Sequence, residues 1–214
     1  MTIVISSTDS YQDCWNPFFS LFEKFIDDLS KFKIYLITDN VTYNDHSFVK
    51  TILTSKKGKI IPWSDRIKLA LNHIEDISFL LILEDYFLYS SINFTELKRL
   101  KSILNNDPDI GSIKIVNHHN SNLINSSFKD LKIIDKFSSY RISLQPTLWK
   151  KDFLKDLLIK GENPWHFEIL GTFRSFFLNK KLLVPSNEWF ENNKKIYDTN
   201  GPGAIKKGEW ICSE

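Results

Sequence analysis

Two adjacent carboxylates, Glu84 and Asp85, directly follow the apolar run FLLIL at residues 79–83. Such a run predicts a strand buried on both faces, so the two acids would lie where a buried strand ends. Adjacent carboxylates repel each other, and burial raises their pKa values. A divalent cation relieves both effects, and Mg²⁺ and Mn²⁺ prefer oxygen ligands. The pattern predicts a metal site, with an exposed turn or a helix cap as the alternative, because acids are mostly exposed.

Acids also follow two earlier apolar runs that the sequence predicts to be strands. Asp9 comes shortly after TIVIS at 2–6, and Asp39 comes directly after KIYLIT at 33–38. A helical pattern separates the two runs, so they form a β-α-β unit with parallel strands. The carboxyl ends of parallel strands meet at one edge of the sheet, and ligands bind in the crevice beyond it. We therefore expect these acids and the acid pair to face one crevice.

The rest of the chain alternates helix and strand patterns, which predicts an α/β fold. Helices are expected at 15–29, 64–74, 93–104, 148–160 and 164–178, with Asn16-Pro17 as the cap and first position of the earliest one. Further strands are expected at 112–116 and, as a pair, at 132–140 and 141–144, while 47–55 fits either a helix or a strand. The polar stretch 117–127, with His118 and His119, is expected to be a loop.

The composition is that of an ordinary globular domain, with 42% hydrophobic and 25% charged residues among 214. The net charge of +2 gives no reason to expect a nucleic-acid partner. The N-terminus lacks the basic start of a signal peptide, and no apolar stretch approaches the length of a membrane span. Cys14 and Cys212 are expected to be free thiols, as in a reducing compartment, so we expect a cytoplasmic protein.

Four segments resemble a group of bacterial and large-virus glycosyltransferases that build surface glycans. They are PWSDRIKLALNHI at 62–74, FLLILEDYFL at 79–88, YRISLQPTLWKKDFL at 140–154 and GENPWHFEILGTFRS at 161–175. The resemblance implies a single GT-A domain over 1–214, in which a mostly parallel mixed sheet is flanked by helices. A nucleotide-sugar-binding half is expected at about 1–116, and an acceptor-binding half with a C-terminal loop at about 117–214.

The acid pair corresponds to the DxD-type motif of GT-A enzymes, which holds a divalent cation on the donor diphosphate. This chain has Leu83-Glu84-Asp85, so the first Asp of the motif is replaced by Leu83. The resemblance implies that Asp85, in the last motif position, binds Mn²⁺ or Mg²⁺. Glu84 is expected to support Asp85 or to contact the ribose.

The resemblance also implies a set of donor-site residues at the strand ends and at the start of the helix 64–74. The hydroxyl and carboxylate groups at the first two strand ends can contact base or ribose, although helix capping and turns explain them equally well. The helix start favours phosphate, and its arginine adds a fixed charge. The expected donor-site residues are Ser7, Thr8, Asp9, Asp39, Asp65, Arg66, Glu84 and Asp85.

Catalytic and acceptor residues are expected later in the chain. Inverting GT-A enzymes place an acid there that deprotonates the acceptor hydroxyl, and Glu168 is preferred to Glu162 for this role. An acid in a first helical turn is also favoured by the helix dipole. Gln145, Trp149 and Trp165 are expected to contact sugar or acceptor, with a core position as the alternative for Trp149.

The sequence therefore predicts a metal-dependent glycosyltransferase that moves a sugar from a nucleotide-diphosphate donor, with a UDP-sugar as first candidate, to a hydroxyl of a glycan. A sugar-phosphate nucleotidyltransferase and a non-catalytic nucleotide- or glycan-binding module are the alternatives. The chain can also be one part of a larger multidomain protein. The loop at 201–203, with Lys206 and Lys207, would close over the donor or form a solvated basic tail.

Overall fold

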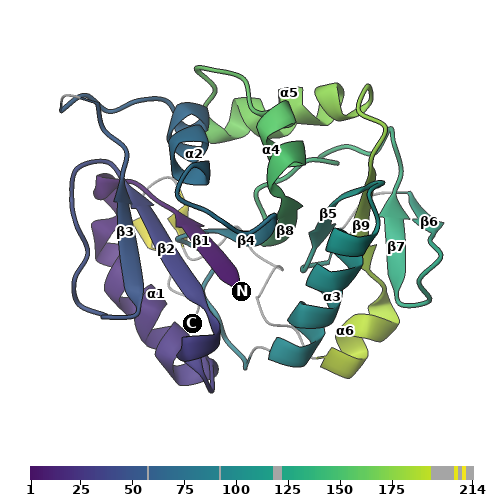
Figure 1. Cartoon of the computed structure of the whole chain (residues 1–214), viewed down its shortest axis with the longest axis horizontal. Helices are drawn as coiled ribbons and strands as arrows, with labels where there is room; N and C mark the ends of the chain where they lie inside the picture. The colour runs from purple at the N-terminus through teal and green to yellow at the C-terminus, as the bar shows by residue number, and fades with distance from the viewer. Residues whose placement is uncertain (57, 92, 118–121, 194–204, 207–208, 211–214) are drawn as a thin grey trace.

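A nine-stranded mixed sheet forms the centre of the computed structural model, which describes residues 1–56, 58–91, 93–117, 122–193, 205–206 and 209–210 (Figure 1). The strand order is β3-β2-β1-β4-β8-β5-β9-β7-β6. The strands are β1 (Thr2–Ser6), β2 (Lys33–Thr38), β3 (Val49–Leu53), β4 (Ser78–Leu83), β5 (Ile110–Lys114), β6 (Leu123–Asn125), β7 (Leu131–Ile134), β8 (Thr147–Lys150) and β9 (Lys181–Pro185). A separate two-stranded ribbon pairs β10 (Ile205–Lys206) with β11 (Glu209–Trp210).

The first four strands are parallel, as expected for the first half of the chain. β8 then runs antiparallel to both β4 and β5, and the remaining strands mix parallel and antiparallel pairs. Ser6, the last residue of β1, pairs with Ile37 on one side and with Leu83 on the other. Three strand ends are therefore level with one another, which brings the segments that follow them to one edge of the sheet.

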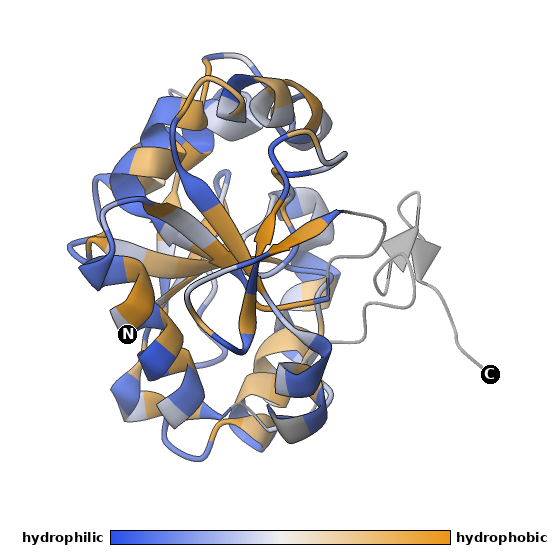
Figure 2. Ribbon diagram, turned by 90° about the vertical axis from the view of Figure 1, so that its right-hand side faces the viewer, coloured by the Kyte–Doolittle hydropathy of each residue, from blue (hydrophilic) through white to orange (hydrophobic). Residues whose placement is uncertain are grey.

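Helices cover both faces of this sheet, so the molecule has three layers (Figures 1 and 2). The helices are α1 (Gln12–Phe25), α2 (Trp63–Leu71), α3 (Phe94–Asn106), α4 (Lys151–Leu157), α5 (Pro164–Ser175) and α6 (Asn187–Asn193), with short 3-10 turns at Asp9–Tyr11 and Leu29–Lys31. α2, α4 and α5 lie on one face, and α1, α3 and α6 lie on the other. Within the described part of the chain, each helix is too short or too polar to cross a lipid bilayer.

Alternation along the strands divides the core into two clusters. In β1, Ile3 and Ile5 pack with α1 and α3, whereas Val4 faces the cluster of α2, α4 and α5. The apolar strand β4 contributes to both clusters. Leu80 and Ile82 belong to the cluster with α1 and α3, and Phe79 and Leu81 belong to the cluster with α2, α4 and α5. This explains why its sequence lacks the polar alternation of a half-exposed strand.

Several sequence-based expectations about elements are confirmed, and the ambiguous segment 47–55 contains strand β3. The strands at 2–6 and 33–38 have the expected bounds. The expected helices at 64–74, 93–104 and 164–178 are found as α2, α3 and α5 with shifted ends. Cys14 is a buried free thiol, as expected, and Cys212 lies outside the described residues.

Other expectations are wrong. Residues 148–150 belong to strand β8 rather than to a helix, and the helix that follows is short. β7 pairs with β6 and β9, so the expected pairing of 132–140 with 141–144 does not form, and β6 lies in the segment expected to be a loop. α1 begins at Gln12, which leaves Pro17 inside the helix rather than at its first position. In each case long-range strand pairing or an earlier turn outweighs the local pattern.

Candidate functional site

A cavity of about 430 Å³ lies at the sheet edge where β1, β2 and β4 end. Its lining includes Ser7 and Thr8 after β1, Glu84 and Asp85 after β4, and Arg66 on α2. Tyr11, Trp63, Leu83 and Pro164 complete much of the wall. The structure therefore brings the segments after β1 and β4 together with the start of α2. They meet at the sheet edge where the sequence predicted a crevice.

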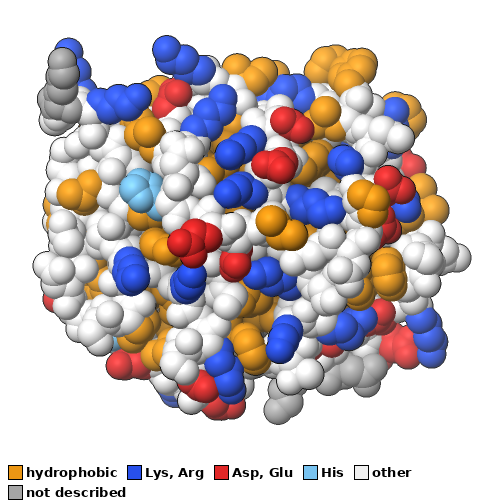
Figure 3. All heavy atoms as spheres, viewed as in Figure 1, with side chains coloured by type: hydrophobic (Ala, Val, Ile, Leu, Met, Phe, Trp, Pro, Cys, Tyr) orange, Lys and Arg blue, Asp and Glu red, His pale blue; other side chains and the backbone are white. Residues whose placement is uncertain are grey.

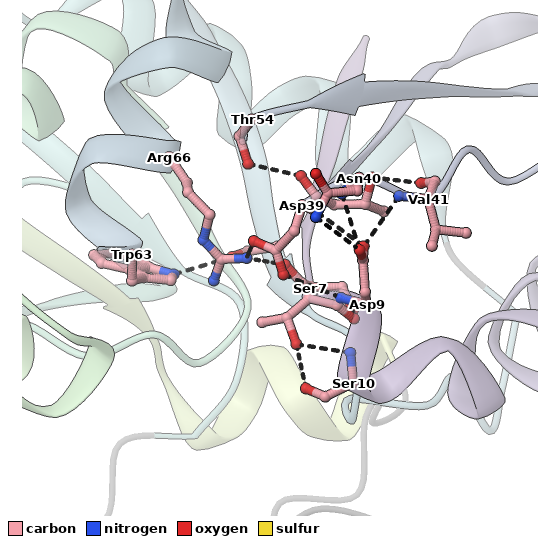
Figure 4. A network of polar contacts seen from close by, with 12 residues as sticks. Ser7, Asp9, Ser10, Asp39, Asn40, Val41, Thr54, Trp63 and Arg66 are labelled. Atoms are coloured by element: carbon pink, nitrogen blue, oxygen red, sulfur yellow. Dashed lines mark hydrogen bonds and ion pairs between the residues drawn. The ribbon is translucent and has the colours of Figure 1, made fainter. Parts of the chain in front are cut away.

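Asp9 and Asp39 hold the edge of this cavity together rather than lining it (Figure 4). The Asp9 carboxylate accepts hydrogen bonds from the backbone N–H groups of Asp39 at 3.0 Å, Asn40 at 2.9 Å and Val41 at 3.3 Å. Burial opposes ionisation of Asp9, but these backbone donors outweigh it and lower its pKa. The bonds fix the segment after β1 to the segment after β2.

Arg66 extends this network into the cavity (Figure 4). Its Nη1 donates to the Ser7 carbonyl oxygen at 2.7 Å and to Asp39 Oδ1 at 3.0 Å, and both charged side chains are buried. Trp63 Nε1 donates to Ser6 Oγ at 3.0 Å, which ties the start of α2 to β1. Asp39 thus fixes the position of a guanidinium group that faces the cavity.

Glu84 and Asp85 are held in the cavity wall with no positive partner. Among the described residues, no Lys, Arg or His nitrogen lies within 4.0 Å of either carboxylate. Burial raises the pKa of Glu84 to about 8, with Asp85 adding repulsion and Arg66 opposing it. Burial likewise raises the pKa of Asp85 to about 6, and its Oδ1 is buried without a hydrogen-bond partner.

The donor set at this point suits a divalent cation whose coordination is completed from outside the protein. The described residues contain no group of three or more His, Cys, Asp and Glu side chains that could hold a metal by themselves. The buried Glu84 and the half-buried Asp85, whose Oδ1 has no hydrogen-bond partner in the described part of the chain, nevertheless offer carboxylate oxygens of the kind that Mg²⁺ and Mn²⁺ prefer. The ligands still missing would have to come from a bound anion or water.

A second polar group lies around Glu168 on the inner side of α5. Glu168 Oε1 accepts a hydrogen bond from the backbone N–H of Leu144 at 2.7 Å. Burial raises the pKa of Glu168, with this bond and the charge of Lys114 opposing the rise. Lys114, the last residue of β5, is only 3% exposed. Burial lowers the pKa of its ammonium group to about 7, against the attraction of Glu168.

Tyr86 connects the two polar groups. It directly follows Asp85, and its hydroxyl forms a hydrogen bond with the side chain of Gln145. Burial raises the pKa of Tyr86, and the charges of Asp85 and Glu168 raise it further, so both acids lie within electrostatic reach of its hydroxyl. Sequence reasoning missed Lys114 and Tyr86, although a lone lysine in the apolar run SIKIV is a signal that could have marked the first of them.

Glu162 has a different environment from Glu168. Its Oε1 and Oε2 accept bonds from Arg174 Nη1 at 2.7 Å and Nη2 at 2.8 Å, and its backbone N–H donates to Ser64 Oγ at 3.0 Å. Asp65 accepts from the backbone N–H of Gly161 at 3.1 Å. The structure therefore places Glu162 and Asp65 in a joint between α2 and the loop before α5, outside the cavity lining. Both carboxylate oxygens of Glu162 accept from Arg174 there, and its role as a base stays a prediction.

The aromatic residues expected at the acceptor side lie elsewhere. Trp149 is on β8, 1% exposed, and its ring packs near Phe153 and Phe167 at centroid distances of 6.0 and 6.5 Å. It is a core residue because 148–150 form a central strand. Trp165 is 77% exposed on the outer face of α5. His118, His119, Lys207 and the loop at 201–203 lie outside the described residues.

The sequence matches no protein-family model and no curated protein sequence. Solved structures do match. S. aureus TarS superimposes with a TM-score of 0.60 at 14% identity, over 92% of this chain and 35% of that chain. Residues 1–349 of TarS in complex with UDP give a TM-score of 0.60 at 13% identity, over 92% of this chain and 58% of that one. UDP-glucose pyrophosphorylase complexed with UDP-glucose gives 0.52 at 10% identity, over 86% and 89%.

These comparisons establish the fold. The chain shares the α/β fold of TarS and of UDP-glucose pyrophosphorylase, with a mixed central sheet flanked by helices. It spans about a third of the length of TarS. The cavity described above lies beyond the carboxyl ends of the parallel strands, where ligands bind in open α/β sheets.

Proposed function

We propose that the protein is a glycosyltransferase that binds a nucleotide-diphosphate sugar, with a UDP-sugar as donor, and transfers the sugar to a hydroxyl of a glycan. One observation carries the proposal: the buried Glu84 and the half-buried Asp85 lie in the wall of the strand-end cavity with no positive partner within 4.0 Å among the described residues. Two structures that share the fold are TarS in complex with UDP and with UDP-GlcNAc.

Within this proposal, Asp85 binds a divalent cation, Mn²⁺ or Mg²⁺, and Glu84 supports it or contacts the ribose. A bound cation would neutralise charge on the departing nucleotide diphosphate. It would also remove the repulsion between the two carboxylates and favour their ionised forms. Burial without a protein cation supports this role, because an isolated ionised carboxylate is costly to desolvate.

Ser7, Thr8 and Arg66 are proposed to bind the rest of the donor. Their side chains or backbone line the cavity beside the acids, and Arg66 is held by Asp39 and by the Ser7 carbonyl. A guanidinium fixed by two bonds can receive a phosphate oxygen without losing further side-chain entropy. Asp9, Asp39 and Asp65 then act by fixing the loops that form the cavity.

Glu168 is proposed as the general base that accepts the proton of the acceptor hydroxyl as that oxygen attacks the sugar. Its raised pKa lies closer to neutrality than that of an exposed glutamate, which suits a base that works near pH 7. The Leu144 N–H fixes one carboxylate oxygen and leaves the other for the proton. Gln145, bonded to Tyr86, is proposed to orient the sugar or the acceptor between the two polar groups.

Calorimetric titration with UDP and with GDP, each with and without Mn²⁺, tests the proposal. The expected result is UDP binding near micromolar affinity that requires Mn²⁺. If the folded protein binds neither nucleotide under any condition, the donor site is wrong. If GDP binds and UDP does not, the donor class is wrong while the site stands.

A sugar-phosphate nucleotidyltransferase is the second candidate, because UDP-glucose pyrophosphorylase shares the fold over most of its length. It predicts that pyrophosphate converts a UDP-sugar to UTP and a sugar phosphate. A transferase would instead release UDP, slowly to water or faster to an acceptor. Chromatography of the nucleotide products distinguishes UTP from UDP directly.

A further inference from the structure

The outer face of α5 is apolar and uncovered. Trp165, Ile169 and Phe173, spaced four residues apart, point along one side of the helix, and Phe177 follows just after its end. Together with Phe137 in the loop after β7, these side chains are between 57% and 77% exposed. We refer to these five residues as the α5 face. Isolated exposed hydrophobic residues are ordinary, but a contiguous group is not.

Three aromatic members of this face, Phe137, Phe173 and Phe177, are joined by ring contacts among themselves and with Phe176. Ring centroids are 5.8 Å apart for Phe173 and Phe176, 5.5 Å for Phe173 and Phe177, and 5.6 Å for Phe137 and Phe176. The loop after β7 and the end of α5 are therefore one aromatic surface. Ile159, Leu170 and Tyr140 are further exposed apolar residues on α5 and the loops beside it.

Two exposed lysines lie beside the α5 face. Lys136 precedes Phe137, Lys160 lies in the loop before α5, and both are exposed. Over Pro164–Ser175, every residue of which the structure describes, the one acid is Glu168, and it is bound to the Leu144 N–H on the inner side. The nearby acid Glu162 is paired with Arg174. Figure 3 shows hydrophobic side chains beside Lys and Arg side chains along the edge where α5 lies in Figure 1.

We propose that the α5 face binds the surface of an anionic lipid membrane. Exposed Trp and Phe side chains flanked by lysines, with no exposed acid on the helix itself, are the pattern of a helix that lies in the membrane–water interface. The inference does not depend on the reaction.

Membrane binding through α5 would place the cavity next to the lipid headgroups. Pro164, the first residue of α5, lines the cavity, and Glu168 faces inward from the same helix. The outer face would enter the lipid while the inner face supports the polar groups. An acceptor carried on a lipid would then be held at the surface that the protein also binds.

Co-sedimentation of the 214-residue chain with vesicles tests this inference. Vesicles of phosphatidylcholine alone are compared with vesicles that contain phosphatidylglycerol. We expect binding to the anionic vesicles that weakens as salt is raised, because salt screens the lysine–lipid attraction. Binding to neither kind of vesicle would overturn the proposal.

Matched variants locate the binding surface. The double variant Phe137→Ser/Phe177→Ser should bind anionic vesicles at least about tenfold more weakly, since burial of one such side chain is worth about a factor of ten. Lys136→Gln/Lys160→Gln should lose about fivefold per lysine. The control Leu53→Ser/Ile77→Ser removes two side chains that are 51% and 62% exposed elsewhere, and it should bind as the original chain does. Equal losses in the control would overturn the assignment to α5.

Two further measurements separate lipid from other occupants. Trp165 is exposed whereas Trp15, Trp63, Trp149 and Trp189 are buried, so vesicles should shift the tryptophan emission to shorter wavelength, and Trp165→Phe should remove most of the shift. Sedimentation velocity tests for self-association. A dimer that Phe137→Ser/Phe177→Ser dissociates, in a protein that ignores vesicles, would show that a second copy covers the face.

Discussion

Two regions of this molecule bury carboxylates, and they treat them in opposite ways. At the joint between α2 and α5, Glu162 accepts two bonds from Arg174, and both side chains are engaged with each other. At the end of β4, Glu84 is buried and Asp85 half-buried with no such partner among the described residues, and their pKa values are raised to about 8 and about 6. Both regions lie next to helices α2 and α5. Burial alone therefore does not explain why only one of them contains a positive partner for its acid.

The comparison teaches which buried acids belong to the framework and which are available to a ligand. A buried carboxylate with a bidentate arginine has its desolvation cost offset within the protein, and removing either partner is strongly destabilising. A buried carboxylate with no cation nearby weakens the folded state until something positive binds. The α2–α5 joint is thus complete as it stands, whereas under the proposed function a ligand would complete the β4 end.

The largest expected effect is a loss of sugar-transfer rate on substitution of Glu168, which distinguishes it from Glu162, six positions earlier. In Glu168→Gln the sugar-transfer rate should fall about 10²- to 10⁴-fold, the usual contribution of a general base. UDP affinity and the urea midpoint should change little, because the amide can still accept from the Leu144 N–H. Single-turnover kinetics with the variant provides the measurement. A rate that stays within a factor of three would remove Glu168 from the chemistry.

Glu162→Ala should affect stability instead. It leaves Arg174 without its partner, which we expect to cost about 3 kcal/mol of unfolding free energy. Urea denaturation measures this loss. The double variant Glu162→Ala/Arg174→Leu should recover much of it, because no uncompensated charge remains. If the single variant were as stable as the original chain, the framework role of the joint would be wrong.

Asp85→Asn should act on ligand binding. The amide keeps the size of the side chain but loses its charge, so Mn²⁺-dependent UDP affinity should fall at least about tenfold, or about 1.4 kcal/mol. The unfolding free energy should stay equal or rise slightly, because a buried charge is removed. Glu162→Gln is the matched control for calorimetry. Unchanged Mn²⁺-dependent binding in Asp85→Asn would sink the metal assignment.

The last expected effect, the smallest when counted per pH unit, is a pH dependence of stability. Glu84 has a folded pKa of about 8, above the value of about 4.3 for an unfolded glutamate. Between these values the folded state binds more protons than the unfolded state, so stability falls as pH rises, by about 1.4 kcal/mol per pH unit at most. Urea titrations between pH 5 and 8 measure the slope.

Glu84→Gln should flatten that slope, because the amide does not titrate. Saturating Mn²⁺ and UDP should flatten it as well, since a bound cation favours the carboxylate. A slope that the variant leaves unchanged would assign the proton uptake to another group.

Much of the strand-end site could be predicted from the sequence. The strands that carry it, β1, β2 and β4, are local apolar runs, and the parallel arrangement that aligns their ends follows from a β-α-β unit. The acid pair stood out because the five residues before it, FLLIL, are all apolar. Local pattern and tertiary position agree there.

The parts that could not be predicted depend on partners distant in sequence. Thr147–Lys150 forms a strand because β4 and β5 are positioned to pair with it, although the segment fits the start of an amphipathic helix. Sequence spacing alone does not show that Glu162 pairs with Arg174 rather than with another cationic side chain. Lys114 is buried because neighbouring elements cover the end of β5, which no local pattern records.

The position of β8 between β4 and β5 has a consequence for synthesis of the chain. Strands β1 to β5 have all left the ribosome once Lys114 has emerged, yet β4 and β5 cannot close the sheet until Lys150 follows, 36 residues later. At about 5–20 residues per second this interval lasts about 2–7 s. During it, the most apolar strand of the molecule has one open edge, which is the kind of surface that chaperones and other nascent chains bind. Folding of the first half is thus expected to wait for translation of the second.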